Sequence, residues 1–237
     1  MLFLFLTLRH CYQLFKKKQS IAQWQSALQI PQHFSHFNTL YRHTNGFILS
    51  RLSRQQLDGF EYTYGEIDFS SFIALLGLTR PNKKTRFYDL GCGVGKAVIA
   101  CAMVFDVDYA CGIEILAPLY QAAEQSKQAL SVIPHYAHKT QSVCFIQDDF
   151  LQIDLQSATL IFINAAGFIG PLWQAVCDKL IKNAKHATII VASKTLPQTH
   201  FFLSRQTWVT MSWGIVRASI YTYKDPVALR PLMQKAQ

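Results

Sequence analysis

Residues 86–96 read Arg-Phe-Tyr-Asp-Leu-Gly-Cys-Gly-Val-Gly-Lys, and no other stretch restricts the possible folds as strongly. Its first five residues predict a short, buried strand, and residues 97–104 predict an apolar helix. Between them, three glycines at alternate positions allow the backbone to turn sharply with no side chains in the way: Gly91, Gly93 and Gly95. A strand, a glycine turn and a helix predict a nucleotide-type site at the carboxyl end of a parallel strand.

The spacing within this turn argues against two phosphate-binding motifs. A dinucleotide-binding turn needs a small residue at the sixth position from its first glycine, and the bulky Lys96 stands there. A phosphate-binding loop needs Ser or Thr after its lysine to bind magnesium, and Ala97 follows instead. The remaining pattern, Asp-Leu-Gly-Cys-Gly-Val-Gly, resembles motif I of the S-adenosylmethionine-dependent methyltransferases with a doubly wound sheet. That resemblance implies S-adenosyl-L-methionine as the cofactor, with its methionine part against the glycine turn.

Acidic side chains follow at the ends of the next two predicted strands. Residues 109–113 predict a strand that ends at Glu114, about twenty residues past the turn. A carboxylate at this tip can accept hydrogen bonds from both hydroxyls of a ribose. A third strand over residues 143–146 leads into Asp148, Asp149 and Phe150. By the resemblance, an acidic residue here holds the adenine amino group and the apolar neighbour covers the ring. Asp149 matches better than Asp148, and both stay candidates.

The rest of the chain alternates between helix and strand, as a doubly wound sheet requires. We expect an α/β fold with a doubly wound, seven-stranded, mostly parallel sheet that ends in an antiparallel hairpin, the layout that the resemblance implies. The expected helices cover residues 119–130 and 170–181, and the later strands cover 159–163, 187–192, 206–211 and 215–223. We expect a basic, mainly helical N-terminal extension over residues 1–59 and a methyltransferase domain over residues 60–237.

Further segments resemble the non-SET histone lysine methyltransferases, the family named for disruption of telomeric silencing. Tyr64-Gly65-Glu66 lies one helix before the glycine turn, where the family has the same three residues in a loop that covers the cofactor. Asn164 and Phe168 match the family's Val-Asn-Asn-Phe-Ala-Phe, in which Ala165 and Ala166 replace the second Asn and the first Phe. Ser193-Lys194 and Ser212-Trp213 match as well, so the resemblance covers residues 60–224.

The resemblance implies a lysine N-methyltransferase that acts on a protein, histone-like substrate. It assigns Tyr64, Asn164 and Phe168 as catalytic residues, and it implies that Ala165 and Ala166 line the substrate channel. The residues that it places against the cofactor are Glu66, Asp89, Gly91, Gly93, Gly95, Glu114, Asp149, Phe150 and Asn164.

The residues themselves are compatible with methylation of an amine. The acceptor nitrogen must lie in line with the methyl group in a dry pocket, and positioning alone supplies about 7–11 kcal/mol in well-oriented systems. An apolar channel lowers the pKa of a lysine, which favours the neutral nucleophile. Asn164 would orient the amine through its oxygen. The aromatic residues available for the channel walls are Tyr62, Tyr64, Phe168 and Trp213.

Two alternative functions stay open. In the first alternative, the methyl acceptor is a small molecule or a nucleic acid. The Asn-Pro-Pro-Tyr motif of base methyltransferases, however, does not follow the strand over residues 159–163. Alternatively, the chain is a cofactor-fold binding module without catalysis, and the intact turn with both acidic tips argues against this.

Charge is distributed unevenly along the chain. The formal net charge is +9, yet no Asp or Glu occurs before Asp58. Such a basic arm favours an acidic partner: nucleic acid, a nucleosome-like assembly or an anionic membrane. Residues 1–8 are apolar but make up only about a third of the roughly 20 residues that a membrane span needs. They either pack onto the domain or contact a membrane peripherally, as an amphipathic helix does.

Cysteine and histidine spacing predicts neither disulfides nor a metal site. The six cysteines include no C-x-x-C pair, and most of them lie in apolar runs. This pattern fits a reducing compartment, and we expect a cytoplasmic protein. Among the eight histidines, His33 and His36 are three residues apart in a loop-like stretch, where we expect surface residues rather than metal ligands.

Overall fold

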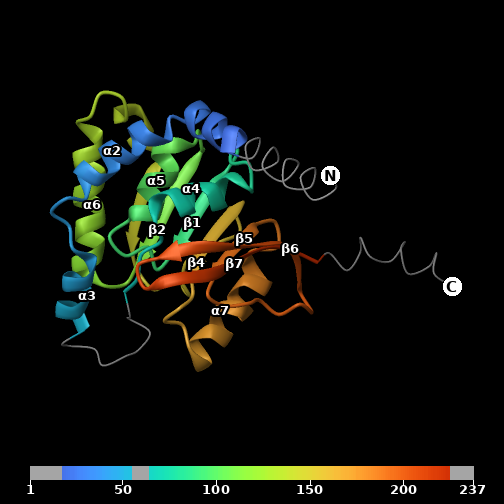
Figure 1. Ribbon diagram of the computed structural model, residues 1–237. Coiled ribbons are helices and arrows are strands. Elements are labelled where there is room, and N and C mark those ends of the chain that lie inside the picture. Colours follow the sequence, from blue (N-terminus) through green and yellow to red (C-terminus); the bar gives the residue numbers. More distant parts are fainter. Residues whose placement is uncertain (1–17, 55–63, 225–237) are drawn as a thin grey trace, which may run out of the picture.

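The computed structural model describes residues 18–54 and 64–224, which form a seven-stranded sheet between two layers of helices (Figure 1). The strands lie in the order β3-β2-β1-β4-β5-β7-β6. Their bounds are β1 Arg86–Leu90, β2 Tyr109–Glu114, β3 Val143–Gln147, β4 Leu160–Asn164, β5 Thr188–Ala192, β6 Phe201–Met211 and β7 Gly214–Tyr223. The predicted α/β class and the antiparallel hairpin at the end of the sheet are confirmed.

Strands β1 to β5 are parallel, whereas β7 is antiparallel to β5 and β6 is antiparallel to β7. The chain moves outward from β1 to β2 and β3, then returns to the other side of β1 with β4. This reversal of strand order makes a crevice at the carboxyl ends of β1, β2 and β4, where ligands bind in open α/β sheets. The fold therefore brings the glycine turn, the end of β2 and the end of β4 together.

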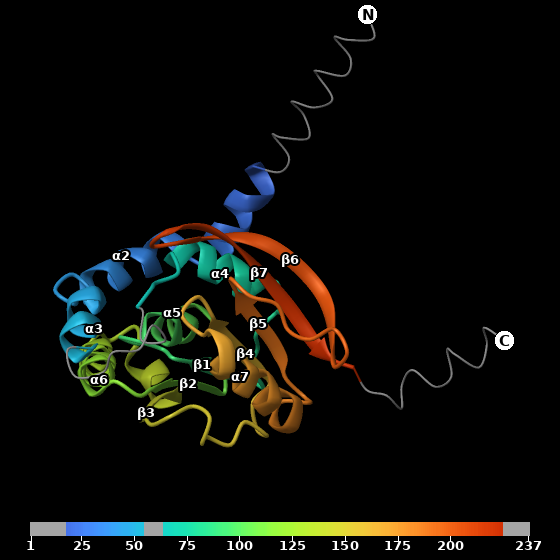
Figure 2. The ribbon, with the colours of Figure 1, turned by 90° about the horizontal axis from the view of Figure 1, so that it is seen from below.

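Helices cover both faces of the sheet (Figure 2). One face is packed by α2 Ile30–Leu40, α4 Phe69–Gly77, α5 Lys96–Val104 and α6 Ala117–Ser131. The other face is packed by α7 Gly170–Asn183. Helix α3 Gly46–Arg54 lies against α6, and the short 3₁₀-helix η2 Ala137–Ser142 leads into β3. Because both faces are covered, the central strand β4 is apolar up to its last residue, Asn164, as its sequence predicted.

The edge strand β6 begins at Phe201, five residues before the predicted start at residue 206. A register shift between Leu203 and Arg205 interrupts its pairing with β7. The whole strand lies at the edge of the sheet, and residues 204–206, at this bulge, are all exposed. The alternation of apolar and polar residues that marks a strand is therefore lost in its first half.

The prediction that His33 and His36 are surface residues in a loop is wrong. Both lie in α2, where His33 is buried and its Nδ1 is 2.7 Å from the Tyr136 hydroxyl. Burial, together with the nearby Lys139, lowers the pKa of His33 to about 4, so the ring is neutral. Pro31 does not interrupt this helix, because it occupies the first turn of α2, where proline is tolerated. Among the described residues no group of His, Cys, Asp or Glu is arranged to hold a metal ion.

The predicted N-terminal extension packs onto the domain where it is described. Ile30, Phe37 and Tyr41 belong to the same buried cluster as the helices α4 and α5. The predicted boundary at residues 59 and 60, the aromatic Tyr62 and the apolar residues 1–8 lie outside the described part of the chain. Within residues 18–54 and 64–224, no helix has the length and apolar character to cross a membrane. The cytoplasmic location stays a prediction.

Candidate functional site

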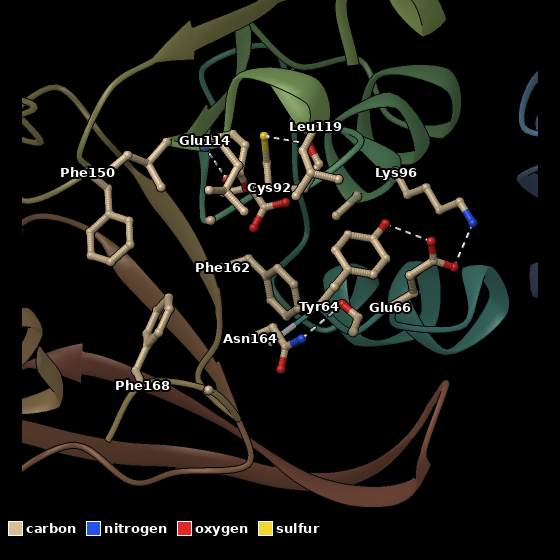
Figure 3. A pocket seen from close by; sticks show the side chains of 18 of the residues that line it. Tyr64, Glu66, Cys92, Lys96, Glu114, Leu119, Phe150, Phe162, Asn164 and Phe168 are labelled. Atoms are coloured by element: carbon tan, nitrogen blue, oxygen red, sulfur yellow. Dashed lines mark hydrogen bonds and ion pairs between the residues drawn. The ribbon is translucent and has the colours of Figure 1, made fainter. Parts of the chain in front are cut away.

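The glycine turn has the backbone conformation that its sequence predicted. Gly91, Gly93 and Gly95 have φ values of 81°, 57° and 79°, in the left-handed region that side chains rarely adopt. A Cβ atom at Gly93 would lie 2.5 Å from Cε2 of Tyr64, so the ring covers the turn at this point. The turn lines a cavity of about 270 Å³ at the carboxyl ends of the strands (Figure 3). Eight of the nine residues predicted to contact a cofactor line this cavity, and Gly95 is the exception.

Gly95 lies behind the turn rather than in the cavity wall. It is the N-cap of α5, and a Cβ atom there would lie 2.5 Å from Cζ of Phe145. Its small size therefore allows α5 to pack closely against β3. In a dinucleotide-binding turn the small residue at the sixth position has this packing role, and here Gly95 has it one position earlier.

Glu114 joins the end of β2 to the glycine turn. Its Oε2 accepts a hydrogen bond from the Gly93 amide at 2.8 Å, and its Oε1 accepts one from the Leu116 amide at 2.9 Å. The side chain is only 6% exposed, and burial raises the pKa of the carboxyl although the two amides oppose this shift. Each carboxylate oxygen can accept a second hydrogen bond, so the group retains acceptor capacity toward the cavity.

Asp89, at the end of β1, also lines the cavity but has no such support. It is 4% exposed, and no group in the described chain donates a hydrogen bond to its carboxylate. Burial, with a smaller effect of the Glu114 charge, raises the pKa of Asp89 to about 8. A buried carboxyl without a donor is costly, and an ammonium group beside it would offset that cost.

The opposite end of the cavity is aromatic. Phe150 and Phe168 both line it, and their ring centroids lie 5.2 Å apart. Asp149 lines it as well, with its Oδ1 accepting a hydrogen bond from the Leu151 amide at 2.9 Å. Asp148 does not reach the cavity but accepts a hydrogen bond from the Asp149 amide at 2.7 Å. The position of Asp149 thus favours it over Asp148 as the acidic residue of this end.

Asn164 is the last residue of β4, and one of the two polar atoms of its side-chain amide has a hydrogen-bond partner. Its Nδ2 donates to the Gly65 carbonyl oxygen at 3.2 Å, while its Oδ1 is buried without a hydrogen-bond partner in the described chain. An unpaired buried acceptor costs about 1–3 kcal/mol, so its presence in a cavity wall points to a ligand donor. Of the replacements in this loop, Ala165 is buried in the core and Ala166 is exposed. Neither alanine lines the cavity as the described residues shape it, in contrast to the expectation that they line a channel.

Residues 64–68 form a segment that covers one side of the cavity, and we call them the cover segment. Tyr64 donates a hydrogen bond to Glu66 Oε1 at 2.7 Å, and Lys96 Nζ lies 2.6 Å from Glu66 Oε2. The backbone of Glu66 pairs with Ser212 in both directions, and Ile67 forms a β-bridge with Met211. The hairpin residue Trp213, which is 47% exposed, lies directly over Gly65.

Lys96 is the principal residue of this site that the sequence did not suggest. It is the first residue of α5 and lines the cavity, as do the apolar residues Leu116, Leu119, Phe162 and Leu172. Its partner Glu66 is 30 positions away in the sequence, beyond α4 and β1. No local pattern connects two charges at that distance, so only the folded chain reveals the pair.

Comparison with known families accounts for this combination of fold and cavity. The family described as "Histone methylation protein DOT1" matches residues 51–224, most of the chain. The chain belongs to the DOT1 family. The predicted resemblance is thereby confirmed at the level of the family, and the matched region contains every residue of the cavity.

One curated relative is a Caenorhabditis elegans protein named "Histone-lysine N-methyltransferase, H3 lysine-79 specific". It is 29% identical over 140 residues, which cover 56% of this DOT1-family chain and 15% of the relative. The match thus spans a small part of the relative's length.

Solved structures similar to this chain include YjhP from E. coli, with a TM-score of 0.50 and 9% identity over 74% of this chain and 99% of that one. This similarity concerns the fold alone. A Salinibacter ruber RNA methyltransferase in complex with S-adenosyl-L-homocysteine has a TM-score of 0.49 and 20% identity, over 65% of this chain and 92% of that one.

Proposed function

We propose that this chain is an S-adenosyl-L-methionine-dependent lysine N-methyltransferase that acts on a histone-like protein. One observation carries the proposal: in a DOT1-family chain, the same cavity contains a carboxylate without a donor and an amide oxygen without a partner. The first is Asp89, which suits the ammonium group of the cofactor's methionine part. The second is Asn164, which suits an N–H of an acceptor amine.

The remaining residues of the cavity fit the other parts of this cofactor. Glu114 has acceptor capacity that suits the ribose hydroxyls. Asp149 would accept from the adenine amino group, and Phe150 would cover the ring. The backbone of Gly91 and Gly93 would make room for the methionine part, with Glu66 and Tyr64 on the covered side.

When bound, the cofactor supplies an electrophilic methyl group on a sulfonium. The chain itself must then deliver a neutral amine in line with that group and keep water out. The apolar rings of Phe168 and Phe162 lower the pKa of an incoming lysine by desolvating its charge. Asn164 Oδ1, already held by the bond from its amide nitrogen to Gly65, would orient the amine.

Tyr64 acts as a wall and not as a base in this proposal. Burial and the Glu66 carboxylate raise the pKa of its phenol far above the usual range. The hydroxyl therefore stays protonated and donates to Glu66. We name no general base, since transfer needs only an amine that has lost its proton before it enters.

We also propose that the basic N-terminal region contacts the acidic part of a nucleosome-like substrate. Its described charges Lys18, Arg42 and Arg51 are exposed, and Arg42 lies beside the cover segment in a second, shallower depression with Glu66 and Lys96. This arrangement supports binding of a nucleic acid next to the cover segment.

The test is methyl transfer from labelled S-adenosyl-L-methionine to separate samples of core histones, nucleosomes, RNA and small amines. We expect label on lysine in the histone or nucleosome samples, and its loss in the Asp89→Ala variant. Label confined to RNA or small amines would contradict the lysine assignment. Absence of calorimetric binding of the cofactor would contradict the enzyme assignment as a whole.

A further inference from the structure

We infer that Lys96 is a positioning residue that holds the cover segment closed over the cofactor by means of its ion pair with Glu66. The inference rests on the proposed function, because it assigns a task at the same cavity. It changes the role of Glu66 from a direct cofactor contact to a link between Lys96 and Tyr64.

Every polar atom of Glu66 already has a partner within the protein. One carboxylate oxygen accepts from Tyr64 and the other lies 2.6 Å from the Lys96 ammonium. The amide donates to Ser212 Oγ at 3.1 Å, and the carbonyl oxygen accepts from the Ser212 amide at 2.8 Å. Both oxygens of Glu66 are thus held by groups of the protein, and in this inference the carboxylate acts on a ligand through Tyr64 and Lys96.

Lys96 is an unusual choice for its position. It is the first residue of α5, where the helix dipole disfavours a positive charge. The side chain is 24% exposed and that of Glu66 is 18% exposed, so the pair is partly shielded from water and from salt. The ammonium also lies 5.3 Å from the centroid of the Tyr41 ring. The cost of a cation at this helix end is offset by these contacts, which fix its direction toward the cover segment.

The ion pair connects directly to the glycine turn. Tyr64, held by Glu66, lies against Gly93 on one side and forms an edge contact with Phe47 on the other, with centroids 5.1 Å apart. Tyr41, under the ammonium, donates a hydrogen bond to the Val94 carbonyl oxygen at 3.2 Å. The pair therefore joins the cover segment, the turn and α5 in one arrangement, drawn with its two contacts in Figure 3.

The other contacts of the cover segment do not replace this pair. Ser212 and Met211 hold its backbone from the hairpin, and Asn164 holds the Gly65 carbonyl oxygen. None of these reaches the Tyr64 hydroxyl, which donates its hydrogen bond to Glu66. Loss of the lysine would leave Glu66 as a half-buried carboxylate without its cation, and it would move toward water together with Tyr64.

The experiment measures the affinity for S-adenosyl-L-methionine by calorimetry, together with thermal unfolding, for four variants and the natural chain. Lys96→Met keeps the length of the side chain but removes its charge, and we expect a loss of affinity of about tenfold or more. Lys139→Met is the matched control, because it removes a lysine of similar exposure that pairs with Asp106 outside the cavity. We expect its affinity to stay within twofold of the natural chain.

The decisive variant exchanges the charges, Lys96→Glu with Glu66→Lys. The phenol oxygen of Tyr64 can accept from an ammonium as readily as its hydroxyl donates to a carboxylate. We therefore expect the exchange to regain most of the lost affinity, which a general loss of stability would not do. If Lys96→Met does not fold, Glu66→Gln tests the same contact, since the amide oxygen still accepts from Tyr64.

Unchanged affinity in Lys96→Met, or in Glu66→Gln, would overturn the inference while leaving the proposed function intact. An exchange variant that folds but binds as weakly as Lys96→Met would also overturn it, because Lys96 would then contact the cofactor directly. Failure of the natural chain to bind the cofactor would overturn the proposed function and this inference together.

Discussion

The amide of Gly93 donates a hydrogen bond to the carboxylate of Glu114 across 2.8 Å, so that the glycine turn and the tip of β2 form one unit. The second oxygen of Glu114 accepts from Leu116, where α6 begins. One buried carboxylate thus fixes the turn after β1 to the turn after β2. The residue expected to bind the ribose is also a structural support of the turn that we propose as the site of the methionine part.

The Glu114→Ala variant should therefore lose both stability and cofactor affinity. Two buried amides would lose their acceptor, at a cost of about 1–3 kcal/mol in the free energy of unfolding. The affinity for S-adenosyl-L-methionine should fall by at least tenfold, which calorimetry measures. Glu124→Ala, on the outer part of α6, is the control and should change neither. An affinity that survives in Glu114→Ala would show that the ribose has another partner.

The Gly93→Ala variant tests the close contact between Tyr64 and the turn. A methyl group there meets the Tyr64 ring at 2.5 Å and also requires an unfavourable positive φ. Gly170→Ala is a matched control, since Gly170 has a similar φ of 52° but open space around its Cβ position. In the control, backbone strain should lower the free energy of unfolding by about 1 kcal/mol, as measured by thermal unfolding. In Gly93→Ala we expect the free energy of unfolding to fall by about 2–4 kcal/mol and the cofactor to bind more weakly. Equal costs would mean that the ring moves aside freely.

The Asp89→Asn variant should alter how stability depends on pH. The folded chain raises the pKa of Asp89 to about 8, from 3.8, so it keeps a proton that the unfolded chain releases between these values. This group's contribution therefore lowers the free energy of unfolding as pH rises from 4 to 8. The neutral asparagine removes that effect, and its melting temperature should exceed that of the natural chain at pH 8, by about 2–4 °C for each kcal/mol regained in a chain of this size.

Well below the unfolded-state pKa of 3.8 the same difference should vanish, because Asp89 then keeps its proton in both states. A cofactor ammonium beside Asp89 would stabilise its charged form, so saturating S-adenosyl-L-methionine should reverse the order of the two proteins at pH 8. Melting curves at several pH values, with and without the cofactor, measure both effects. A difference that is constant from pH 4 to pH 8 would contradict the assigned titration.

The Asn164→Leu variant separates the acceptor side from the cofactor side. It removes the unpaired Oδ1 and also the bond to the Gly65 carbonyl oxygen. Without the oxygen that orients the amine, we expect kcat to fall by about 10²-fold. The dissociation constant of the cofactor should change by less than tenfold, since the Ser212 contacts still hold the cover segment. A fall in cofactor affinity as large as the fall in kcat would place Asn164 on the cofactor alone.

Local pattern sufficed for the main elements of the fold. The glycines at 91, 93 and 95 appear as a left-handed turn between a buried strand and a helix, because no other residue tolerates those φ values so well. The uninterrupted apolar run at residues 159–163 appears as the central strand β4, since both of its faces are covered. The acidic tips at Glu114 and Asp149 reach one cavity because parallel strands end at one edge of the sheet.

Contacts between distant segments decided the rest. His33 was mistaken for a surface residue because its partner Tyr136 lies 103 positions away. The start of β6 was placed too late because a bulge at an exposed edge leaves no alternating pattern. Lys96 was discounted as too bulky for the turn, although its length is what allows it to reach Glu66.

From the sequence alone come the class of fold, the turn at residues 91–95 and the residue types at the strand tips, since each depends on backbone preference and hydrophobic period over a few neighbouring residues. The tertiary structure alone decided which of these groups have partners. It left Asp89 and the Asn164 oxygen unpaired at one cavity, and it joined Lys96 to Glu66. The energy of a buried polar group depends on what surrounds it in space, and no local stretch of sequence contains that information.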